Sequence, residues 1–435
     1  MNDKIIILGA GMAGFGAAHH LRTHGIDSQV FDKNNYHGGN GASFNTDGFI
    51  FDEGPHISFT KVERLQKLFA ESIKNKYETF DVGVNNLWKG HWIKHPAQVN
   101  LHGLPEDLVV TIIEEFIETK NKDSKAKIIS FKDWLYASFG KTFAETFPMK
   151  YGHKFHTTKA DNMSIDWVGP RLYQPDIKEV LHGALSKKTK DVHYVTHFRY
   201  PTNGGFVSFF NGFIEKTNIN LNHKLIELNS KLKELTFENG KIINYKHVVS
   251  SIPLPEIIPL IKDAPKKVID ASKKLACSTC VIVNLGIDRT DISEAHWSYF
   301  YDEDIVFTRL SFPHMQSVNN TPDNCGSIQA EIYFSKKYKP LSKNPEEFIE
   351  QTISDLISCG LLNKNDKILY KDAKIIPYAN VIFDHDRAEN LKIVHQYLDK
   401  IEVAYCGRYG EWGYQWTDES FISGEKAAQK ILDKI

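Results

Sequence analysis

The chain has 435 residues, of which 41% are hydrophobic and 25% are charged, with 53 basic and 54 acidic side chains. This length allows two or three structural units with sizeable cores, and it excludes disorder for the bulk of the chain. The formal net charge of −1 supplies no general field for phosphate backbones, so the composition argues against nucleic acid as a partner.

The five cysteines are too few for a disulfide framework, and their odd number leaves at least one thiol free. This favours a reducing compartment, so we expect a cytoplasmic protein. Cys277 and Cys280 form one CxxC pair without a second pair at zinc-finger spacing, so we expect simple buried thiols. The apolar run at the N-terminus is interrupted by glycines, and no window of about 18 uninterrupted apolar residues occurs. We therefore expect neither a signal peptide nor a transmembrane helix.

The N-terminal segment predicts a strand, a helix and a second strand. Residues 4–8 (KIIIL) are typical of a strand that is buried on both faces of a parallel sheet. Residues 12–22 predict a helix that ends before Gly25, and residues 28–32 (SQVFD) predict the second strand. A βαβ unit of this kind joins two parallel strands by a right-handed crossover. We therefore expect an α/β fold.

The later segments alternate between helical and strand patterns. Residues 61–185 are predicted to be mostly helical, because apolar side chains recur at helical spacing between short breaks. Residues 278–340 contain long alternating runs, which favour a mostly antiparallel sheet. The remaining expectations, in chain order, are a glycine-rich loop at 36–43, a strand and turn at 48–59, short strands and a helix at 192–255 with a hairpin turn at Asn239 and Gly240, a strand at 401–407 and a helix at 417–432.

Three glycines at the mouth of the first helix form a dinucleotide fingerprint. Gly9, Gly11 and Gly14 make the pattern GxGxxG directly after the first predicted strand. Such a turn lets the backbone approach a pyrophosphate, and the unpaired N–H groups of a helix N-terminus favour an anion. Asp32 ends the second predicted strand, where a carboxylate accepts hydrogen bonds from ribose hydroxyl groups. The pattern predicts a dinucleotide site, with a bare structural turn as the alternative.

Several segments, taken in order, resemble one group of flavoproteins. They are the glycine turn with Asp32, HGGN at 37–40, GFIFDEGPHI at 48–57, FRYPTNGGFVSFFNGF at 198–213, VVSSIPLPEI at 248–257 and CGRYGEWGYQWTDESFISGEKAA at 406–428. This order is similar to that of the FAD-binding amine-oxidase superfamily. The resemblance implies FAD as the cofactor. It also implies a Rossmann-like FAD-binding domain beside a second, mixed substrate domain that contains an antiparallel sheet and helices.

The same resemblance implies how the chain is divided and which residues meet the cofactor. The FAD-binding domain is expected to be discontinuous, comprising residues 1–85, 190–255 and 395–435. A helical insertion at 86–189 and a sheet-rich insertion at 256–394 are expected to form the substrate domain. The residues implied to contact FAD are Gly9, Gly11, Met12, Ala13, Gly14, Asp32, Lys33, Gly38, Gly39, Asn40, Leu225, Gly407, Arg408 and Trp416.

Within the superfamily, the segments are similar to the UDP-galactopyranose mutases and the protoporphyrinogen-oxidase-like proteins. The residues with implied catalytic roles are His56, Arg309, Arg408 and Tyr414. Those with implied substrate contacts are Arg171, His156, Arg309 and Tyr414. Arginine suits a diphosphate because its planar fork pairs two phosphate oxygens at once. The similarity thus implies a small-molecule substrate, with a sugar nucleotide as one candidate.

Two positions depart from the mutase pattern: Phe59 replaces a second histidine, and His156 lies where a tryptophan would stack on uracil. Structural roles stay open beside the functional ones. His56 could be a structural histidine in a turn, and Arg309 could pair with a protein acid. The aromatic group that either lines the flavin cavity or packs the last turn is Tyr409, Trp412, Tyr414 and Trp416. His153 lies three residues before His156 without nearby carboxylates, so no metal site is expected.

The resemblance leaves three functions open. The first is a FAD-dependent oxidoreductase, in which the flavin accepts a hydride from a polar or anionic small molecule. The alternative is a sugar-nucleotide isomerase like the pyranose mutases, in which N5 of the reduced flavin is the nucleophile. The third is a flavin-bound structural or carrier protein without turnover. We favour the oxidoreductase, because it requires only the part of the resemblance that these residues match.

Overall fold

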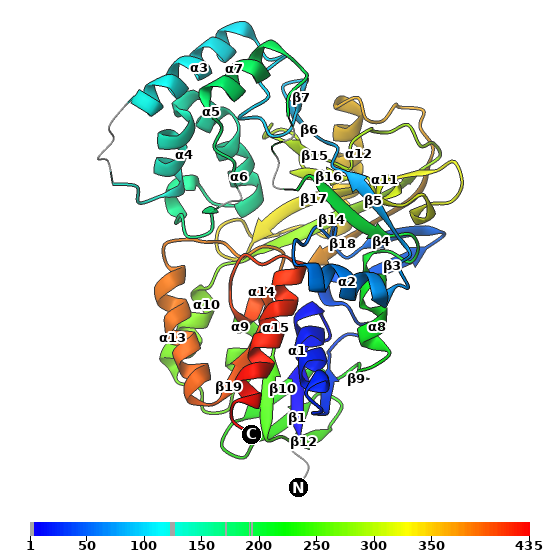
Figure 1. Ribbon diagram of the computed structural model, residues 1–435, viewed down its shortest axis with the longest axis vertical. Coiled ribbons are helices and arrows are strands. Elements are labelled where there is room, and N and C mark those ends of the chain that lie inside the picture. The colour runs from blue at the N-terminus through cyan, green and yellow to red at the C-terminus, as the bar shows by residue number, and fades with distance from the viewer. Residues whose placement is uncertain (1–3, 122–126, 170–171, 191, 193–194) are drawn as a thin grey trace.

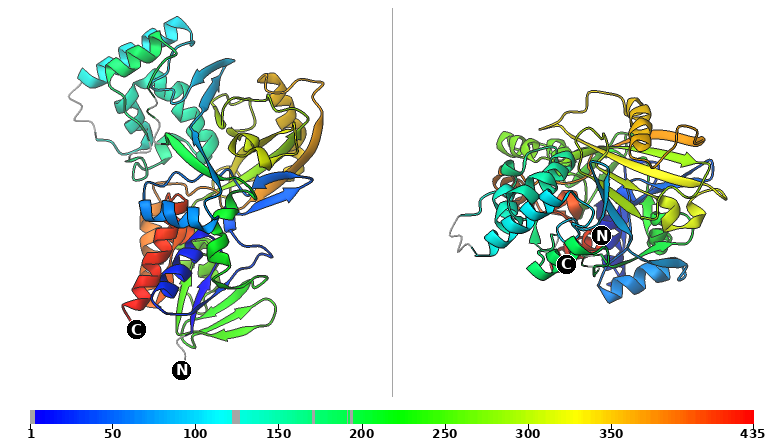
Figure 2. Two further views of the ribbon diagram at one scale, coloured as in Figure 1. Left: turned by 45° about the vertical axis from the view of Figure 1, so that its right-hand side comes forward. Right: turned by 90° about the horizontal axis from the view of Figure 1, so that it is seen from above.

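The computed structural model describes residues 4–121, 127–169, 172–190, 192 and 195–435. Figure 1 shows a lower part that carries the C-terminus, with two lobes above it, one helical and one rich in strands. The two lobes lie side by side at the same end of the molecule in the turned view as well (Figure 2). Segments from both ends of the sequence meet in the lower part.

The lower part is built around a five-stranded parallel sheet. Its strands, in spatial order, are β19 (Val403–Tyr405), β13 (His247–Ser250), β1 (Ile5–Leu8), β2 (Ser28–Phe31) and β9 (Asn218–Asn220). All four residues of β1 are buried. A parallel sheet is covered on both faces, which is why this strand is a continuous apolar run. The predicted α/β fold with a parallel sheet is confirmed.

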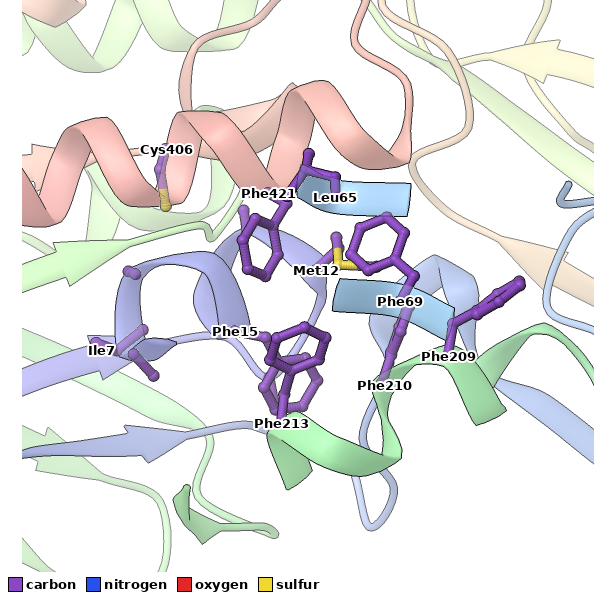
Figure 3. Packing of buried hydrophobic residues seen from close by; sticks show 14 of the residues in the cluster. Ile7, Met12, Phe15, Leu65, Phe69, Phe209, Phe210, Phe213, Cys406 and Phe421 are labelled. Atoms are coloured by element: carbon purple, nitrogen blue, oxygen red, sulfur yellow. The ribbon is translucent and has the colours of Figure 1, made fainter. Parts of the chain in front are cut away.

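One face of the sheet is covered by α1 (Met12–Thr23) and α15 (Thr417–Leu432). The two helices pack closely because glycines line their contact: a Cβ atom on Gly16 would lie 2.1 Å from the carbonyl oxygen of Phe421. Beside them, phenylalanines of α1, α2 (Glu63–Ser72), α8 (Asn211–Ile214) and α15 form one cluster (Figure 3). Ring centres of Phe69 and Phe421 lie 5.8 Å apart, and those of Phe213 and Phe421 lie 5.2 Å apart. This cluster fixes the position of the α1 N-terminus.

The opposite face of the sheet is covered by a second layer. Its elements are the small sheet β10 (Leu225–Asn229), β11 (Glu234–Phe237) and β12 (Ile242–Asn244), with α9 (Leu254–Ile257), α10 (Lys266–Lys274) and α13 (Arg387–Lys400). The predicted hairpin turn at Asn239 and Gly240 joins β11 to β12. The helices α10 and α13 pack together beside the parallel sheet. The domain limits at 256 and 394 remain predictions, and α13 crosses the second of them.

The strand-rich lobe is a seven-stranded sheet. Its order is β18 (Ile368–Ile376), β14 (Ser278–Ile287), β17 (Gly326–Ser335), β16 (Arg309–Ser311), β15 (Trp297–Phe300), β6 (Val84–Trp88) and β7 (His91–Lys94). Every pair is antiparallel except β15 with β6, so the predicted antiparallel sheet is confirmed. One face carries a core with α11 (Pro313–Gln316) and α12 (Ile349–Ser358). The other face looks towards the helical lobe and the cavity described below.

The helical lobe contains α3 (Glu106–Asn121), α4 (Phe131–Phe139), α5 (Lys141–Thr146), α6 (Pro148–His156) and α7 (Ile177–Leu185). The prediction that 61–185 is mostly helical was wrong for residues 77–94, which form β5 (Tyr77–Asp81), β6 and β7. The strands β5 and β6 pair with β8 (His197–Pro201) and β15, and such distant partners override local periodicity. The remaining short elements are η1 (Gly39–Gly41), β3 (Ser43–Thr46), β4 (Phe49–Asp52), η2 (Ala160–Asn162), η4 (Phe206–Phe210), η5 (Ile258–Leu260), η6 (Val318–Asn320), η7 (Pro345–Phe348) and α14 (Gly407–Gly410).

Candidate functional site

A cavity of about 1170 Å³ runs from the end of β1 to the strand-rich lobe. It brings together most of the residues singled out from the sequence, namely Gly9, Gly11, Met12, Ala13, Asp32, Lys33, Gly38, Gly39, Asn40, His56, Leu225, Arg309, Gly407, Arg408, Tyr414 and Trp416. Two others, Gly14 and His156, lie behind its wall. Arg171 lies outside the described residues. Segments far apart in the chain therefore meet at one place.

The first turn of the cavity is built from backbone. Gly9 has φ of +108°, which favours glycine, and its N–H donates to the carbonyl oxygen of Phe31 at 2.7 Å. The helix α1 follows Gly11 without a side-chain cap, so its first N–H groups stay available. A Cβ atom on Gly14 would lie 1.9 Å from the Gly9 carbonyl oxygen. Gly14 therefore lets the helix pack on the turn, while Gly11 and Met12 line the cavity.

The second glycine loop, at residues 36–43, packs directly against the first glycine turn, at residues 9–14. Gly38, with φ of +108°, donates its N–H to the carbonyl oxygen of Ala10 at 2.8 Å. A Cβ atom on Gly39 would lie 3.3 Å from the Cα atom of Gly11. Side chains at either loop would fill the space between them. The two loops thus form a narrow cradle of backbone beside the helix N-terminus.

Asp32 lies at the carboxyl end of β2. Its Oδ2 atom accepts the N–H of Ala10 at 2.7 Å, and its Oδ1 atom accepts the N–H of Asn34 at 2.8 Å. Each carboxylate oxygen can accept a further hydrogen bond, and Asp32 lines the cavity. The carboxylate therefore braces the glycine turn and can still receive ribose hydroxyl groups. This end therefore has the two features that could hold a dinucleotide, namely a backbone cradle beside a helix N-terminus for a pyrophosphate and a carboxylate for a ribose.

The loop after β19 brings Arg408 to the middle of the cavity. Its guanidinium donates to the carbonyl oxygens of Gln415 at 2.9 Å and Ala379 at 2.9 Å. It lies 5.7 Å from the ring centre of Tyr414. In the described part of the chain its hydrogen-bond partners are neutral oxygen atoms. The positive charge of Arg408 is therefore available to an anionic or electron-rich group in the cavity.

Asn40 is tied to the same loop. Its Nδ2 atom donates to the carbonyl oxygen of Tyr378 at 2.9 Å and to the hydroxyl of Tyr409 at 2.8 Å. Tyr409 in turn donates to the Tyr378 carbonyl at 2.6 Å. These bonds join the second glycine loop to the loop that carries Arg408. They also leave the Oδ1 atom of Asn40 as an acceptor.

Arg309 pairs with a protein acid, which was one of the two roles left open for it, and the structure identifies that acid as Glu331. It opens β16, where it stands directly opposite Glu331 of β17. Its Nε and Nη2 atoms donate to the two carboxylate oxygens of Glu331, the second at 2.7 Å. The Glu331 side chain is 4% exposed and that of Arg309 is 25% exposed. The pair therefore satisfies a buried carboxylate and still presents the arginine to the cavity.

Aromatic side chains surround this pair. Tyr299, Tyr333 and Phe155 line the cavity beside Arg309. The rings of Phe155 and Tyr333 have centres 4.7 Å apart, and the hydroxyl of Tyr299 accepts the indole N–H of Trp297 at 3.1 Å. Sequence reasoning missed Glu331 and these tyrosines because strand pairing, not a local motif, brings them together. The alternating runs of 278–340 carried the only signal.

His56 lies in the turn after β4. Its Nδ1 atom donates to the carbonyl oxygen of Gly54, which leaves Nε2 as the acceptor of a neutral ring. Burial, helped by the positive charges of Arg408 and Arg309, lowers the pKa of His56 to about 4. The ring packs on Phe206, with centres 5.2 Å apart. His56 is therefore neutral at pH 7 and lines the cavity as a hydrogen-bonding group.

His156 is buried behind the cavity wall. Burial lowers its pKa to about 3, and its ring centre lies 5.2 Å from that of Trp167. Trp167 in turn stacks on Tyr414, with centres 6.1 Å apart. A tryptophan therefore does reach this region, from a position eleven residues after His156 in the sequence. Of the C-terminal aromatic group, Tyr409, Tyr414 and Trp416 line the cavity, whereas Trp412 is fully buried in the core of the lower part.

Three further observations concern a metal site, the CxxC pair and a membrane-spanning helix. Among the described residues, no group of three or more His, Cys, Asp or Glu side chains could hold a metal ion. Cys280 is buried and Cys277 is partly buried, and both are free thiols, as the CxxC pair predicts. None of the described helices is both long enough and apolar enough to cross a bilayer.

The comparisons with known proteins agree first on the class of domain. The NAD(P)-binding Rossmann-like domain family matches residues 7–72, which confirms the predicted dinucleotide fingerprint. A 1-hydroxycarotenoid 3,4-desaturase of Flavobacterium sp. (strain P99-3) is 33% identical over 127 residues, or 28% of this chain and 25% of the relative. The chain thus spans about a quarter of the length of this curated relative.

Solved structures then define the particular fold. A reduced UDP-galactopyranose mutase superposes with a TM-score of 0.93 at 24% identity, covering 100% of this chain and 96% of the mutase. A putative protoporphyrinogen oxidase from Exiguobacterium sp. 255-15 superposes with a TM-score of 0.77 at 15% identity, covering 100% of both chains. The chain therefore shares the fold of these two proteins, with a Rossmann-like domain and a second, mixed domain, as its sequence predicts. The likeness concerns the fold alone.

Proposed function

We propose that the chain is a FAD-dependent enzyme. The observation that carries this proposal is the continuous cavity, which begins at the backbone cradle of Gly11 and Gly39 and ends at the wall that contains Arg309. Its volume of about 1170 Å³ suits a dinucleotide together with a small substrate. When bound, FAD would supply hydride or electron transfer, and the protein would supply orientation and charge. The proposed cofactor contacts are those predicted from the sequence that line the cavity.

The reaction that these side chains support best is an oxidoreduction of a polar or anionic small molecule. Arg408 offers a positive charge whose partners are neutral. Arg309 is already neutralised by Glu331, so it contributes N–H donors more than net charge. His56 is neutral and contributes a hydrogen-bonding nitrogen. Tyr414 and the other aromatic rings exclude water around these groups. The cytoplasmic location stays a prediction.

A second candidate is a flavin-dependent sugar-nucleotide isomerase. The superposition on a UDP-galactopyranose mutase at TM-score 0.93, over the full length of this chain, favours it. Of the predicted substrate-side arginines in the described part of the chain, only Arg408 lacks a carboxylate partner, because Arg309 is paired with Glu331, and one such charge does not balance a diphosphate. We therefore rank this candidate second.

One experiment tests the cofactor and separates the two reactions. The purified protein is expected to carry a yellow chromophore that is released on denaturation and identified as FAD by mass spectrometry. The oxidised protein is then mixed without oxygen with a set of amines, alcohols and carboxylates, and bleaching near 450 nm is followed. In parallel, the reduced protein is given UDP-galactopyranose. Bleaching supports the oxidoreductase, conversion to the furanose form supports the isomerase, and absence of FAD overturns both.

A further inference from the structure

The loop that carries Arg408 and Tyr414 is held from behind by a third residue, Glu411. The loop leaves β19 at Gly407, which has φ of +76°, and makes the single turn α14. It then crosses to the start of α15. Backbone bonds from Glu411 to Gly407 at 2.9 Å and from Gly413 to Arg408 at 3.0 Å shape the turn itself, and side-chain bonds fix the turn to its surroundings. Arg408 can meet a ligand in one geometry only if those bonds define the loop.

The Glu411 carboxylate makes two short bonds in different directions. Its Oε1 atom accepts the hydroxyl of Ser423 at 2.5 Å, and its Oε2 atom accepts the side-chain amide of Gln415 at 2.5 Å. Ser423 is 3% exposed and belongs to α15, which is locked against α1 by Gly424 and Gly16. One oxygen of the Glu411 carboxylate is therefore bonded to α15, which packs closely against α1.

Gln415 lines the cavity, and Ser423 is bonded to Gly407, which also lines it. The Ser423 hydroxyl oxygen also accepts the N–H of Gly407 at 2.8 Å. The backbone carbonyl of Gln415 accepts both Nε and Nη2 of Arg408, at 2.9 and 2.5 Å. Glu411 thus connects the start of the loop, the end of the loop and the guanidinium group. A carboxylate suits this position because both of its oxygens accept hydrogen bonds.

We propose that Glu411 is a positioning residue, which holds Arg408 at the cofactor through Ser423 and Gln415. This inference rests on the proposed flavin site. Glu411 lines a separate cavity of about 320 Å³ with His395 and Lys430, so it lies behind the loop and acts through Arg408. Removal of the Glu411 carboxylate is expected to weaken FAD binding, because Arg408 would no longer be held in one position. The same removal is expected to have little further effect in a variant that already lacks the Arg408 guanidinium group.

A double-mutant cycle on FAD affinity tests this inference. The Kd for FAD is measured by fluorescence for the full-length wild type, Glu411→Ala, Arg408→Lys and the double variant. Each single variant is expected to raise the Kd about tenfold, and the double variant no more than about twofold above Arg408→Lys. An additive, roughly hundredfold effect, or an unchanged Kd in Glu411→Ala, would overturn the inference.

Two further variants keep the outcomes distinct. Glu411→Gln retains the shape and one acceptor oxygen, so it is expected to recover part of the affinity even if the alanine variant folds poorly. Full loss of affinity in Glu411→Gln with an intact fold would also speak against a positioning role. Glu389→Ala, which removes an exposed carboxylate on α13, serves as the control and is expected to bind FAD like the wild type. If the wild type binds no FAD, the proposed function itself fails, and this inference fails with it.

Discussion

The two ends of the cavity differ in what lines them: mainly backbone at the lower end and mainly side chains at the upper end. At the lower end, the glycine turns at Gly9 and Gly38 leave open space beside the uncapped N-terminus of α1, with the carboxylate of Asp32 next to them. At the upper end, the wall consists of side chains: the Arg309–Glu331 pair and a ring of tyrosines. Backbone recognition is the same for any dinucleotide, whereas a side-chain wall can change from one relative to another. The lower end therefore predicts a dinucleotide, and we propose that the upper end selects the substrate.

The largest expected effect is a loss of stability caused by a substitution at the lower end of the cavity. In Gly14→Ala the new methyl group would lie 1.9 Å from the Gly9 carbonyl oxygen, and neither the helix nor the turn can move without the other. We expect the free energy of unfolding to fall by about 5 kcal/mol, measured by urea denaturation. Gly152→Ala is the matched control, because its methyl group would meet nothing closer than 3.9 Å in α6. Equal stability of the two variants would refute the packing role of Gly14.

The next effect concerns the upper end. Glu331→Ala leaves the partly buried guanidinium of Arg309 without its carboxylate, so we expect a loss of about 3 kcal/mol in the free energy of unfolding. The control is Glu350→Ala, which removes an exposed pair with Lys371 at 2.7 Å and should cost less than about 1 kcal/mol. Replacing both Arg309 and Glu331 with methionine should restore most of the stability. A loss in Glu331→Ala no larger than in the control would mean that the pair is not buried in solution.

A smaller effect tests the cofactor end without unfolding it. Asp32→Ala removes the acceptor of the Ala10 and Asn34 N–H groups and the proposed ribose partner. We expect the Kd for FAD to rise about thirtyfold, or about 2 kcal/mol, measured by fluorescence titration. Asp27→Ala changes an exposed carboxylate just before the opposite end of β2 and should leave the Kd unchanged. Equal affinities of the two variants would place the ribose elsewhere.

The smallest expected effect is a pH dependence of the free energy of unfolding, which comes from His56 between the two ends of the cavity. The pKa of His56 is about 4 in the folded protein, below the ordinary value of about 6.5 in the unfolded chain. The unfolded state therefore binds more protons between these values, and stability falls as the pH falls from 6.5 to 4. Because the ring is partly exposed, we expect about 1 kcal/mol from His56.

The matching variant isolates that contribution. Burial raises the pKa of Asp52 to about 6, which has the opposite sign, because the folded state then binds the extra proton between about 3.8 and 6. Asp52 contributes equally in both proteins, so subtracting the free energy of unfolding of His56→Gln from that of the wild type at each pH cancels its contribution. The variant should lose less stability than the wild type between pH 6.5 and 4. Parallel curves would mean that His56 titrates normally.

The sequence predicted that the glycine turn and Asp32 would lie together, and the structure places them at one end of the cavity. Gly9, Gly11 and Asp32 are close in the chain, and local geometry dictates their types. The substrate end could be predicted only in part. Glu331 meets Arg309 through strand register, and Trp167 reaches His156 through the packing of the helical lobe. Neither contact leaves a local pattern. The strands β5 to β7 were missed for the same reason.

The central claim is that the backbone cradle binds FAD, and a comparison of ligands tests it most directly. The protein, stripped of any bound chromophore, is titrated in a calorimeter with FAD, FMN and NAD⁺. We expect one FAD to bind per chain with a Kd at or below about 1 μM. FMN, which lacks the second nucleotide half, and NAD⁺, which lacks a flavin to meet Arg408 and Tyr414, should bind at least a hundredfold more weakly. Tighter binding of NAD⁺ than of FAD, or no binding of FAD, would show that the cradle is not a FAD site.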